Sequence, residues 1–354
     1  MHFKKPLIFI IAIAALTACK KIDNKQNTTT TPPVVTPPVV TPPVVTPTGT
    51  DTYVAGTITT TKNVTVAAYW KNGVAHLLAD STLYSFTNAI AVKDTDVYIV
   101  GMVDNVATYW KNGVPNHLPN CTEANAITIS GQDIYIGGMN YDVSLYHPAY
   151  WKNGTPVIFT DQSCNYISGI AVSGSDVYLS GNVGSAGGFQ TATYWKNKVP
   201  VSVASNLPGS PFPYYPRNVA IGVAGTDVYI TGNIQNKAGD QVMATYWKNG
   251  VSIPLITDQT LSSEANSITI NGSDVYATGY YDYFAVYWKN SIVNKITDGT
   301  QQFTATALTI NNNNIYISGT KGYSDTHAVY WKNNTLTQLS SKISTAVGIS
   351  VVQH

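Results

Sequence analysis

The sequence predicts an all-β protein: a β-propeller of seven four-stranded antiparallel blades. The first observation is a tetrapeptide, Tyr-Trp-Lys-Asn, that occurs seven times and contains all seven tryptophans. The second is its spacing, which runs from 40 residues (Trp70 to Trp110) to 52 (Trp195 to Trp247), about the length of one blade. The third is that the first and the last copies of the repeat are both incomplete. The tryptophans are Trp70, Trp110, Trp151, Trp195, Trp247, Trp288 and Trp331.

Each repeat contains four short segments with the character of strands. We name them a to d. Segment a is a small residue followed by Ile, any residue and Val or Ile, as in 89–92. Segment b resembles Asp96–Gly101, segment c is Tyr-Trp-Lys-Asn, and segment d follows it. All are rich in β-branched and aromatic residues and are bounded by Gly, Asn, Asp or Ser, which predicts strands joined by turns.

The two ends of the repeat array predict how the ring closes. In every internal repeat, segment b begins six residues after the Ile or Leu of segment a, as from Ile90 to Asp96. The last segment a, at 348–351, would need its partner at position 355, but His354 is the last residue. The first repeat begins at Asp51 with segment b. We therefore expect the C-terminal strand to complete blade 1, which removes an exposed sheet edge.

The first 50 residues predict export and a tether. Lys4 and Lys5 precede an apolar run, 6–15, that is too short to span a bilayer and is typical of a signal peptide. Leu16-Thr17-Ala18-Cys19 resembles the lipobox of bacterial lipoproteins. The resemblance implies removal of residues 1–18 and a lipid on Cys19, at the outer membrane or cell surface. An ordinary signal peptide followed by a chance cysteine is the alternative.

Residues 19–50 are expected to form a disordered Thr/Pro-rich tether between the lipid and the propeller at 51–354. The string Thr-Pro-Pro-Val-Val occurs three times between Thr31 and Val45. Such proline density excludes a helix and favours extended polyproline II. A peptide-recognition segment is the alternative.

Composition excludes several classes of partner. Net charge is +1, only 11% of residues are charged, and Arg217 is the only arginine. These values argue against nucleic acid and against an anionic membrane surface, so we expect membrane attachment through the N-terminal lipid only. The sequence has no His/Cys cluster with metal-ligand spacing, and we expect no metal, no cofactor and a monomer.

The order of segments also resembles two known repeat families. His327-Ala328-Val329-Tyr330-Trp331 and His147-Pro148-Ala149-Tyr150-Trp151 are similar to the extracellular repeat named for a His-Ala-Phe triplet before Trp. The pair Gly137-Gly138 after Ile136 resembles a kelch strand, although the kelch spacing to Trp is not kept. Both resemblances imply a propeller and no particular activity.

Tyr-Trp-Lys-Asn is interpreted as structural. Adjacent Tyr and Trp side chains point to opposite sides of a strand, so each would pack on a different neighbouring blade. Asn-Gly after the motif, as at Asn112-Gly113, favours a two-residue hairpin turn. The lysine would keep this rim soluble. A seven-fold ring of ligand-binding lysines is the alternative.

The candidate binding surface is the opposite face, which carries the b–c and d–a connections. The a–b and c–d turns have constant length, whereas the other connections vary, and binding residues concentrate on variable loops. Aromatic residues cluster there, and their rings and hydroxyls suit sugars; packing of the loops against each other is the alternative. The candidates are Tyr141, Tyr146, His147, Tyr214, Tyr215, Arg217, Tyr280, Tyr281 and Tyr283.

We therefore predict a lipid-anchored envelope protein that binds a glycan or a protein partner. A scaffold without a small ligand is the alternative, and a carbohydrate-active enzyme is a further one. Glu123 and Glu264 occupy matching places in blades 3 and 6, nearly across the ring, which argues against a retaining pair about 5 Å apart. We name no catalytic residues.

Two further features leave alternatives open. An exported protein permits a disulfide between Cys121 and Cys164, but their places in neighbouring blades do not establish the geometry. Recurrent Thr-Asp pairs, such as Thr297-Asp298, are consistent with Ca²⁺ binding, although turn capping is the simpler interpretation.

Overall fold

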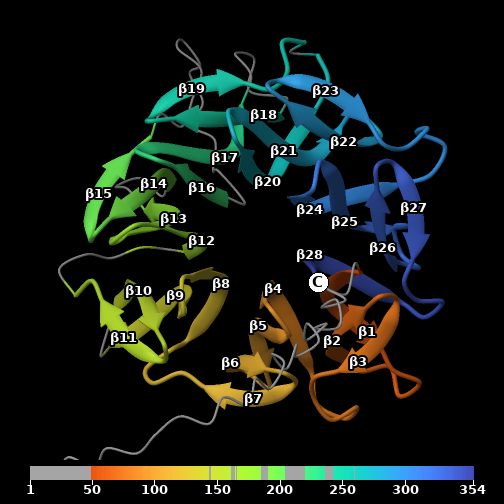
Figure 1. The fold of residues 1–354 in the computed structure, drawn as a ribbon, viewed down its shortest axis with the longest axis horizontal. Helices are drawn as coiled ribbons and strands as arrows, with labels where there is room; N and C mark the ends of the chain where they lie inside the picture. Colours follow the sequence, from red (N-terminus) through yellow and green to blue (C-terminus); the bar gives the residue numbers. More distant parts are fainter. Residues whose placement is uncertain are drawn as a thin grey trace, which may run out of the picture. The chain divides into compact units, whose positions relative to one another are not determined.

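The computed structural model describes residues 49–142, 145–160, 164, 166–184, 190–203, 220–235, 242–258 and 260–354. These residues belong to one compact unit, Thr46–His354, and form seven four-stranded antiparallel sheets arranged in a ring (Figure 1). The predicted fold class is confirmed. Within the described ranges there is no helix long and apolar enough to cross a membrane.

Each sheet keeps the predicted strand order, with strand a nearest the ring axis and strand d at the outer edge (Figure 1). From blade 1 to blade 7, the a strands are β28 (Ser344–Gln353), β4 (Ser85–Lys93), β8 (Glu123–Ser130), β12 (Tyr166–Ser173), β16 (Ala220–Ala224), β20 (Ser263–Asn271) and β24 (Phe303–Asn311). The b strands are β1 (Thr50–Thr59), β5 (Asp96–Val103), β9 (Asp133–Asp142), β13 (Asp176–Gly184), β17 (Asp227–Gln235), β21 (Asp274–Tyr281) and β25 (Asn314–Lys321).

The outer half of each sheet contains the Tyr-Trp-Lys-Asn motif and the strand after it. The c strands are β2 (Thr65–Lys71), β6 (Val106–Lys111), β10 (Leu145–Lys152), β14 (Gln190–Lys196), β18 (Val242–Lys248), β22 (Phe284–Lys289) and β26 (His327–Lys332). The d strands are β3 (Val74–Leu77), β7 (Val114–His117), β11 (Thr155–Ile158), β15 (Val199–Ser202), β19 (Val251–Pro254), β23 (Ile292–Lys295) and β27 (Thr335–Gln338).

The C-terminal strand closes the ring as the sequence predicts. β28 pairs antiparallel with β1, from Thr50 opposite Gln353 to Ile58 opposite Ser344. At the end of the chain, the His354 backbone N–H donates to the Gly49 carbonyl at 2.9 Å. Blade 1 is thus built from the first and last strands of the propeller.

Seven hydrophobic clusters form the core, one at each interface between blades. Each cluster joins the tryptophan of one blade to the motif tyrosine of the preceding blade, as Trp151 of blade 3 joins Tyr109 of blade 2. All seven tryptophans are at most 1% exposed. The prediction that Tyr and Trp pack on opposite neighbours is confirmed, and the motif tryptophans are buried rather than available to a ligand.

The tryptophans differ in hydrogen bonding, which predicts a difference in stability. Trp110 Nε1 donates to the Leu78 carbonyl at 2.8 Å, whereas the buried Trp70 Nε1 has no partner. Both Trp→Phe changes remove similar volume, but Trp110→Phe also leaves the Leu78 carbonyl without its donor. We expect Trp110→Phe to cost about 1–2 kcal/mol more than Trp70→Phe in urea unfolding. Equal losses from the two variants would contradict this expectation.

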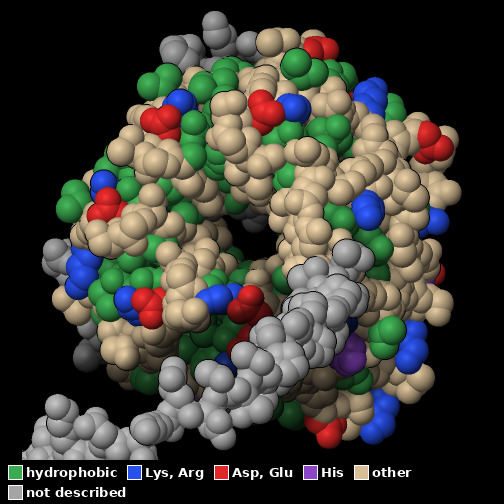
Figure 2. Space-filling view, in the orientation of Figure 1, with side chains coloured by type: hydrophobic (Ala, Val, Ile, Leu, Met, Phe, Trp, Pro, Cys, Tyr) green, Lys and Arg blue, Asp and Glu red, His purple; other side chains and the backbone are tan. Residues whose placement is uncertain are grey.

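The lysine and asparagine of the motif join strand c to strand b through an ion pair and hydrogen bonds. In blade 2, Lys111 Nζ lies 3.0 Å from Asp96 Oδ2, and Asn112 Nδ2 donates to Asp96 Oδ1 at 2.8 Å. Asn112 Oδ1 in turn accepts the Val97 backbone N–H at 2.8 Å. The ion pair recurs in blades 1 to 6. Figure 2 shows acidic and basic side chains next to one another at several places around the ring. The lysine is therefore a structural ion-pair partner and more than a solubilising charge.

These ion pairs and hydrogen bonds predict that the stability of the fold falls in acid. Hydrogen bonds from Asn112, Lys111 and Tyr98 lower the pKa of Asp96 to about 2, and equivalent contacts lower the pKa of the other five aspartates. Because the folded pKa lies below the unfolded value of about 3.9, this stabilisation is present above pH 4 and is lost as the pH falls toward 2.

We expect the melting temperature to fall steeply across that window. Blade 7 has Asn314 in place of the aspartate, and Asn333 Nδ2 donates to Asn314 Oδ1 at 2.7 Å. Asn314→Asp should complete the seventh ion pair with Lys332. It should raise the melting temperature by about 1–2 °C at pH 7 and have no such effect near pH 2. A melting temperature unchanged between pH 5 and pH 2 would refute the acid sensitivity.

A β-bulge recurs where strand a meets strand b. In six blades the register shifts by one residue, and the extra residue is Val347, Asn88, Asn125, Ser168, Asn266 or Thr306. The glycine that recurs in segment b lies opposite this bulge. A Cβ on Gly101 would lie 2.0 Å from the Phe86 carbonyl oxygen, so only glycine fits there.

Candidate functional site

The b–c and d–a connections lie on one face of the ring, which we name the variable face. In blade 2 the b–c connection is a two-residue turn, because β5 extends to Val103 and β6 starts at Val106. Asp104 and Asn105 alone turn the chain, with φ of 45° and 63°. Asn and Asp tolerate this left-handed conformation, so the hairpin extends to its tip.

Three of the predicted site residues, Tyr214, Tyr215 and Arg217, lie outside the described residues. Tyr141 and Tyr146 are cross-strand partners near the end of the β9–β10 hairpin. Their ring centroids are 4.8 Å apart, and they are 48% and 49% exposed. His147, the next residue, is only 3% exposed and therefore lies inside the blade and away from the surface.

The blade 6 tyrosines border a groove that we name the blade 6–7 groove. It has a volume of about 520 Å³ and is lined by Glu264, Tyr280, Asp282, Tyr283 and residues 299–304. Tyr283 lies in the β21–β22 turn and is 78% exposed. Tyr281 does not line the groove and instead packs against the cluster that contains Trp288. Residues from a b–c turn and a d–a connection thus meet in one site.

Polar contacts hold both walls of the groove in place. The Asp282 backbone N–H donates to the Ser262 carbonyl at 2.9 Å. On the other wall, the Thr300 backbone N–H and hydroxyl donate to Asp298 Oδ1 at 3.0 and 2.7 Å. The Thr-Asp pair is therefore a turn cap here, as the simpler interpretation predicted. The exposed Gln301 and Gln302 follow this turn and offer amide groups to a ligand.

Glu264 lies on β20 opposite Tyr280 of β21 and lines the same groove. Burial and the Glu264 carboxylate raise the pKa of Tyr280, and a hydrogen bond with Ser262 partly offsets them. The Tyr280 hydroxyl therefore stays protonated at neutral pH and keeps its donor hydrogen. The sequence pointed to Glu264 and Tyr280 for separate reasons, and the fold places them side by side.

A second cavity of about 360 Å³ lies on the ring axis, and we name it the channel. It is lined by residues of the seven a strands, including all six bulge residues. Figure 2 shows an opening at the axis of the ring. Glu264 and Thr304 line both the channel and the groove, so the two cavities adjoin.

The bulge side chains bind neighbouring blades together around the channel. Asn88 Nδ2 donates to the Ala124 carbonyl at 2.9 Å, and Asn125 Nδ2 donates to the Ile167 carbonyl at 2.9 Å. Asn266 Nδ2 and Thr306 Oγ1 make the same contact, each at 2.9 Å, with Ala305 and Ala346. Sequence reasoning missed these residues. Their signal is a recurrent Asn or Thr two positions before the strand a Ile or Leu.

Of the two glutamates, Glu264 lines the groove and the channel, and Glu123 is not among their lining residues. Glu123 lies on β8 of blade 3, where Asn125 Nδ2 donates to its Oε2 at 3.1 Å. Glu264 lies on blade 6 and, unlike Glu123, lines the channel and groove. Burial, followed by the Glu123 carboxylate, raises the pKa of Tyr166, whose ring lines the channel. The two glutamates thus lie on the a strands of different blades, as the sequence predicts.

Cys121 and Cys164 are both free thiols, which answers the open question of their pairing. Cys164 Sγ lies 3.3 Å from Met139 Sδ, and burial raises the pKa of each cysteine to about 12. They therefore stay protonated at neutral pH. Among the side chains that the structure describes, no three His, Cys, Asp or Glu residues gather as a metal site would require.

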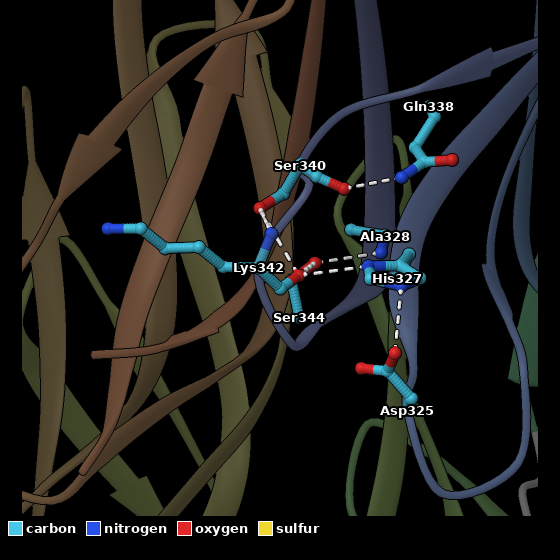
Figure 3. A network of polar contacts seen from close by, with 7 residues as sticks. All are labelled: Asp325, His327, Ala328, Gln338, Ser340, Lys342 and Ser344. Atoms are coloured by element: carbon cyan, nitrogen blue, oxygen red, sulfur yellow. Dashed lines mark hydrogen bonds and ion pairs between the residues drawn. The ribbon is translucent and has the colours of Figure 1, made fainter. Parts of the chain in front are cut away.

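The His327 motif lies in a polar network where blade 7 meets the closing strand (Figure 3). His327 Nδ1 lies 3.1 Å from the Lys342 carbonyl oxygen, and its Nε2 lies 3.6 Å from Asp325 Oδ2. Ser344 Oγ accepts the Ala328 backbone N–H at 2.9 Å and donates to the Lys342 carbonyl at 2.9 Å. These contacts hold the last connection against β26 and give the motif a structural role.

No protein-family model matches the sequence, and a search of curated proteins finds no match. Solved structures do share the fold. A puromycin-hydrolysing peptidase from Mycobacterium tuberculosis is similar with a TM-score of 0.55 and 9% identity over 82% of this chain. The match covers 51% of the peptidase, so this chain spans about half its length.

The matches to two further structures cover most of this chain and nearly all of the matched chain. A nidogen/laminin complex chain has a TM-score of 0.45 and 12% identity over 86% of this chain and 98% of its own. A putative TolB from Agrobacterium tumefaciens has a TM-score of 0.42 and 8% identity over 86% of this chain and 100% of its own. The likeness to the peptidase shows a shared fold alone, and nothing further about this chain is taken from the other two structures.

Proposed function

We propose that this protein is a lipid-anchored cell-envelope protein that binds a glycan in the blade 6–7 groove. The observation that carries the proposal is the groove's composition. The 78% exposed Tyr283 stands beside Tyr280, two carboxylates and the amides of Gln301 and Gln302. Sugar rings stack on aromatic faces, while their hydroxyls need such donors and acceptors. A β-propeller with a groove whose walls are held by hydrogen bonds supports a binding role.

Loss of the exposed ring provides the test. Tyr283→Ala should weaken binding at least tenfold, about 1.4 kcal/mol, because it removes the apolar stacking surface. Tyr323→Ala is the matched control, since Tyr323 is 84% exposed on blade 7 and does not line the groove. A glycan array would identify a ligand, and calorimetry would compare the variants. Failure of the wild type to bind any glycan, or equal losses in both variants, would refute the proposal.

The anchor and location are part of the same proposal. The resemblance of Leu16–Cys19 to a lipobox supports lipid attachment at Cys19, and the resemblance to His-Ala-Phe and kelch-like repeats agrees with an extracellular site. Metabolic labelling with a palmitate analogue should modify the wild type and leave Cys19→Ala unlabelled. The variant should also leave the membrane fraction. Labelling of Cys19→Ala at the wild-type level would refute anchoring at this residue.

A protein partner or scaffold role remains the second candidate, and one observation favours it. Tyr141, Leu145 and Tyr146 form an exposed apolar tip on blade 3, each about half exposed. Mild crosslinking of wild type and Tyr146→Ala would separate the roles. A scaffold would retain its envelope partners only with Tyr146 intact and would ignore glycans. An enzyme would instead lose activity in Glu264→Gln.

A further inference from the structure

We propose that the groove and the channel form one site that takes the end of a neutral glycan chain, with the terminal unit in the channel. This inference rests on the proposed glycan binding and specifies its ligand class. Three observations carry it: the two cavities adjoin, the channel wall is polar and held in place, and the described lining residues carry no positive charge.

The first observation is the shared wall. Glu264 on β20 and Thr304 on β24 line both cavities, so a ligand lying in the groove reaches the channel mouth directly. The groove is bordered by two neighbouring blades, whereas strands from all seven blades line the channel. A polymer can lie along the groove at any point of its length. Only a chain end can enter a cavity that strands surround on all sides.

The second observation is the channel wall itself. Its bulge residues include three asparagines, a serine and a threonine, whose polar groups suit the hydroxyls of a sugar. Asn88, Asn266 and Thr306 are each hydrogen-bonded to the next blade, so the wall is organised before a ligand arrives. The cavity therefore keeps its 360 Å³, within the range of small-molecule sites.

The third observation is charge. Glu264 lies at the junction and Asp282 on the groove wall, and none of the described residues lining either cavity is Lys or Arg. Carboxylates of an anionic glycan would be repelled by Asp282 on the groove wall, where its partial burial strengthens the interaction. The described wall thus favours a neutral chain over a uronate chain.

The experiment asks whether binding follows the number of chain ends or the total mass of glycan. Neutral polysaccharides (a β-glucan, an α-mannan and an arabinan) and polygalacturonate would be tested before and after cleavage to hexamers, by competition at equal mass. Cleavage multiplies the ends without changing the mass. We expect hexamers of the bound neutral glycan to compete at least tenfold better than its polymer, and polygalacturonate hexamers to compete at least tenfold more weakly than the neutral hexamers.

Val347→Phe would narrow the channel and leave the groove lining intact, because Val347 lines the channel but not the groove. We expect it to lose at least tenfold in hexamer affinity, while the matched Val74→Phe, on the exposed strand β3 of the same blade and outside both cavities, retains wild-type affinity. Ser168 lines the channel from blade 4, so Ser168→Phe gives a second narrowed variant if melting temperature shows that Val347→Phe does not fold.

The outcomes separate the two proposals. If the wild type binds no glycan, the proposed function fails and this inference fails with it. If the wild type binds and Tyr283→Ala weakens binding, but polymers compete as well as hexamers or a folded variant with a narrowed channel binds normally, only the chain-end inference is overturned. Equal competition by polygalacturonate hexamers would overturn its charge preference.

Discussion

Deletion of residues 344–354 is expected to abolish the closed ring. The deletion removes β28, which supplies strand a of blade 1 and pairs with β1 along its length. It also removes Ala346 and Ile349 from the cluster around Trp70 and exposes β1 as an unpaired edge. We expect a loss of more than about 5 kcal/mol, enough to unfold most domains or cause association through the open edge.

Far-UV circular dichroism and size-exclusion chromatography would measure this outcome. The matched control deletes only Gln353 and His354, which removes the contact of His354 with Gly49 but keeps most of the β1–β28 pairing. It should stay monomeric with a slightly lower melting temperature. Because an open edge accepts a strand, a synthetic 344–354 peptide should partly restore the fold of the longer deletion. A monomeric 1–343 chain with an unchanged melting temperature would contradict the closure argument.

Gly279→Ala is expected to affect both stability and the site. A Cβ at this position would lie 1.8 Å from the Glu264 carbonyl oxygen, so the bulge of β20 must shift to admit it. Overpacking of this kind costs about 1–3 kcal/mol. Glu264 lines the groove and the channel, so its displacement should also lower glycan affinity several-fold.

Gly101→Ala separates the two effects. Its Cβ would lie 2.0 Å from the Phe86 carbonyl oxygen in blade 2, which is an equivalent strain far from the groove. We expect a similar loss in urea unfolding and unchanged binding by calorimetry. Binding reduced equally in both variants would show that general destabilisation, rather than the position of Glu264, controls the site.

Much of the fold follows from local pattern. Each Tyr-Trp-Lys-Asn copy marks one c strand, and the alternation of side chains across a strand places Trp and Tyr on opposite neighbours. The repeat that is incomplete at Asp51 and at His354 predicts the closing strand, since the six-residue spacing leaves one strand a without its partner. These features depend on sequence distances within a blade, which the chain itself sets.

The candidate site depended more on tertiary structure. Composition marked the tyrosines of blade 6 as a group, but only packing separates Tyr280 and Tyr283, which line the groove, from Tyr281, which packs at an interface. His147 also looked available in the sequence and is buried in the structure. A residue's exposure on a hairpin depends on what the adjacent connection covers, and sequence spacing does not encode that.

From its repeats alone the chain specifies seven blades, their strand order, the buried tryptophans and the closure by its last strand. Each of these depends on regular spacing and on period-two alternation. Packing of the blades decides the rest: the Lys111–Asp96 type of ion pair, the bulge side chains around the channel, and the meeting of Glu264 with Tyr283 and the blade 6–7 connection. These contacts join residues from different strands or blades, so they exist only once the sheets are formed and arranged around the axis.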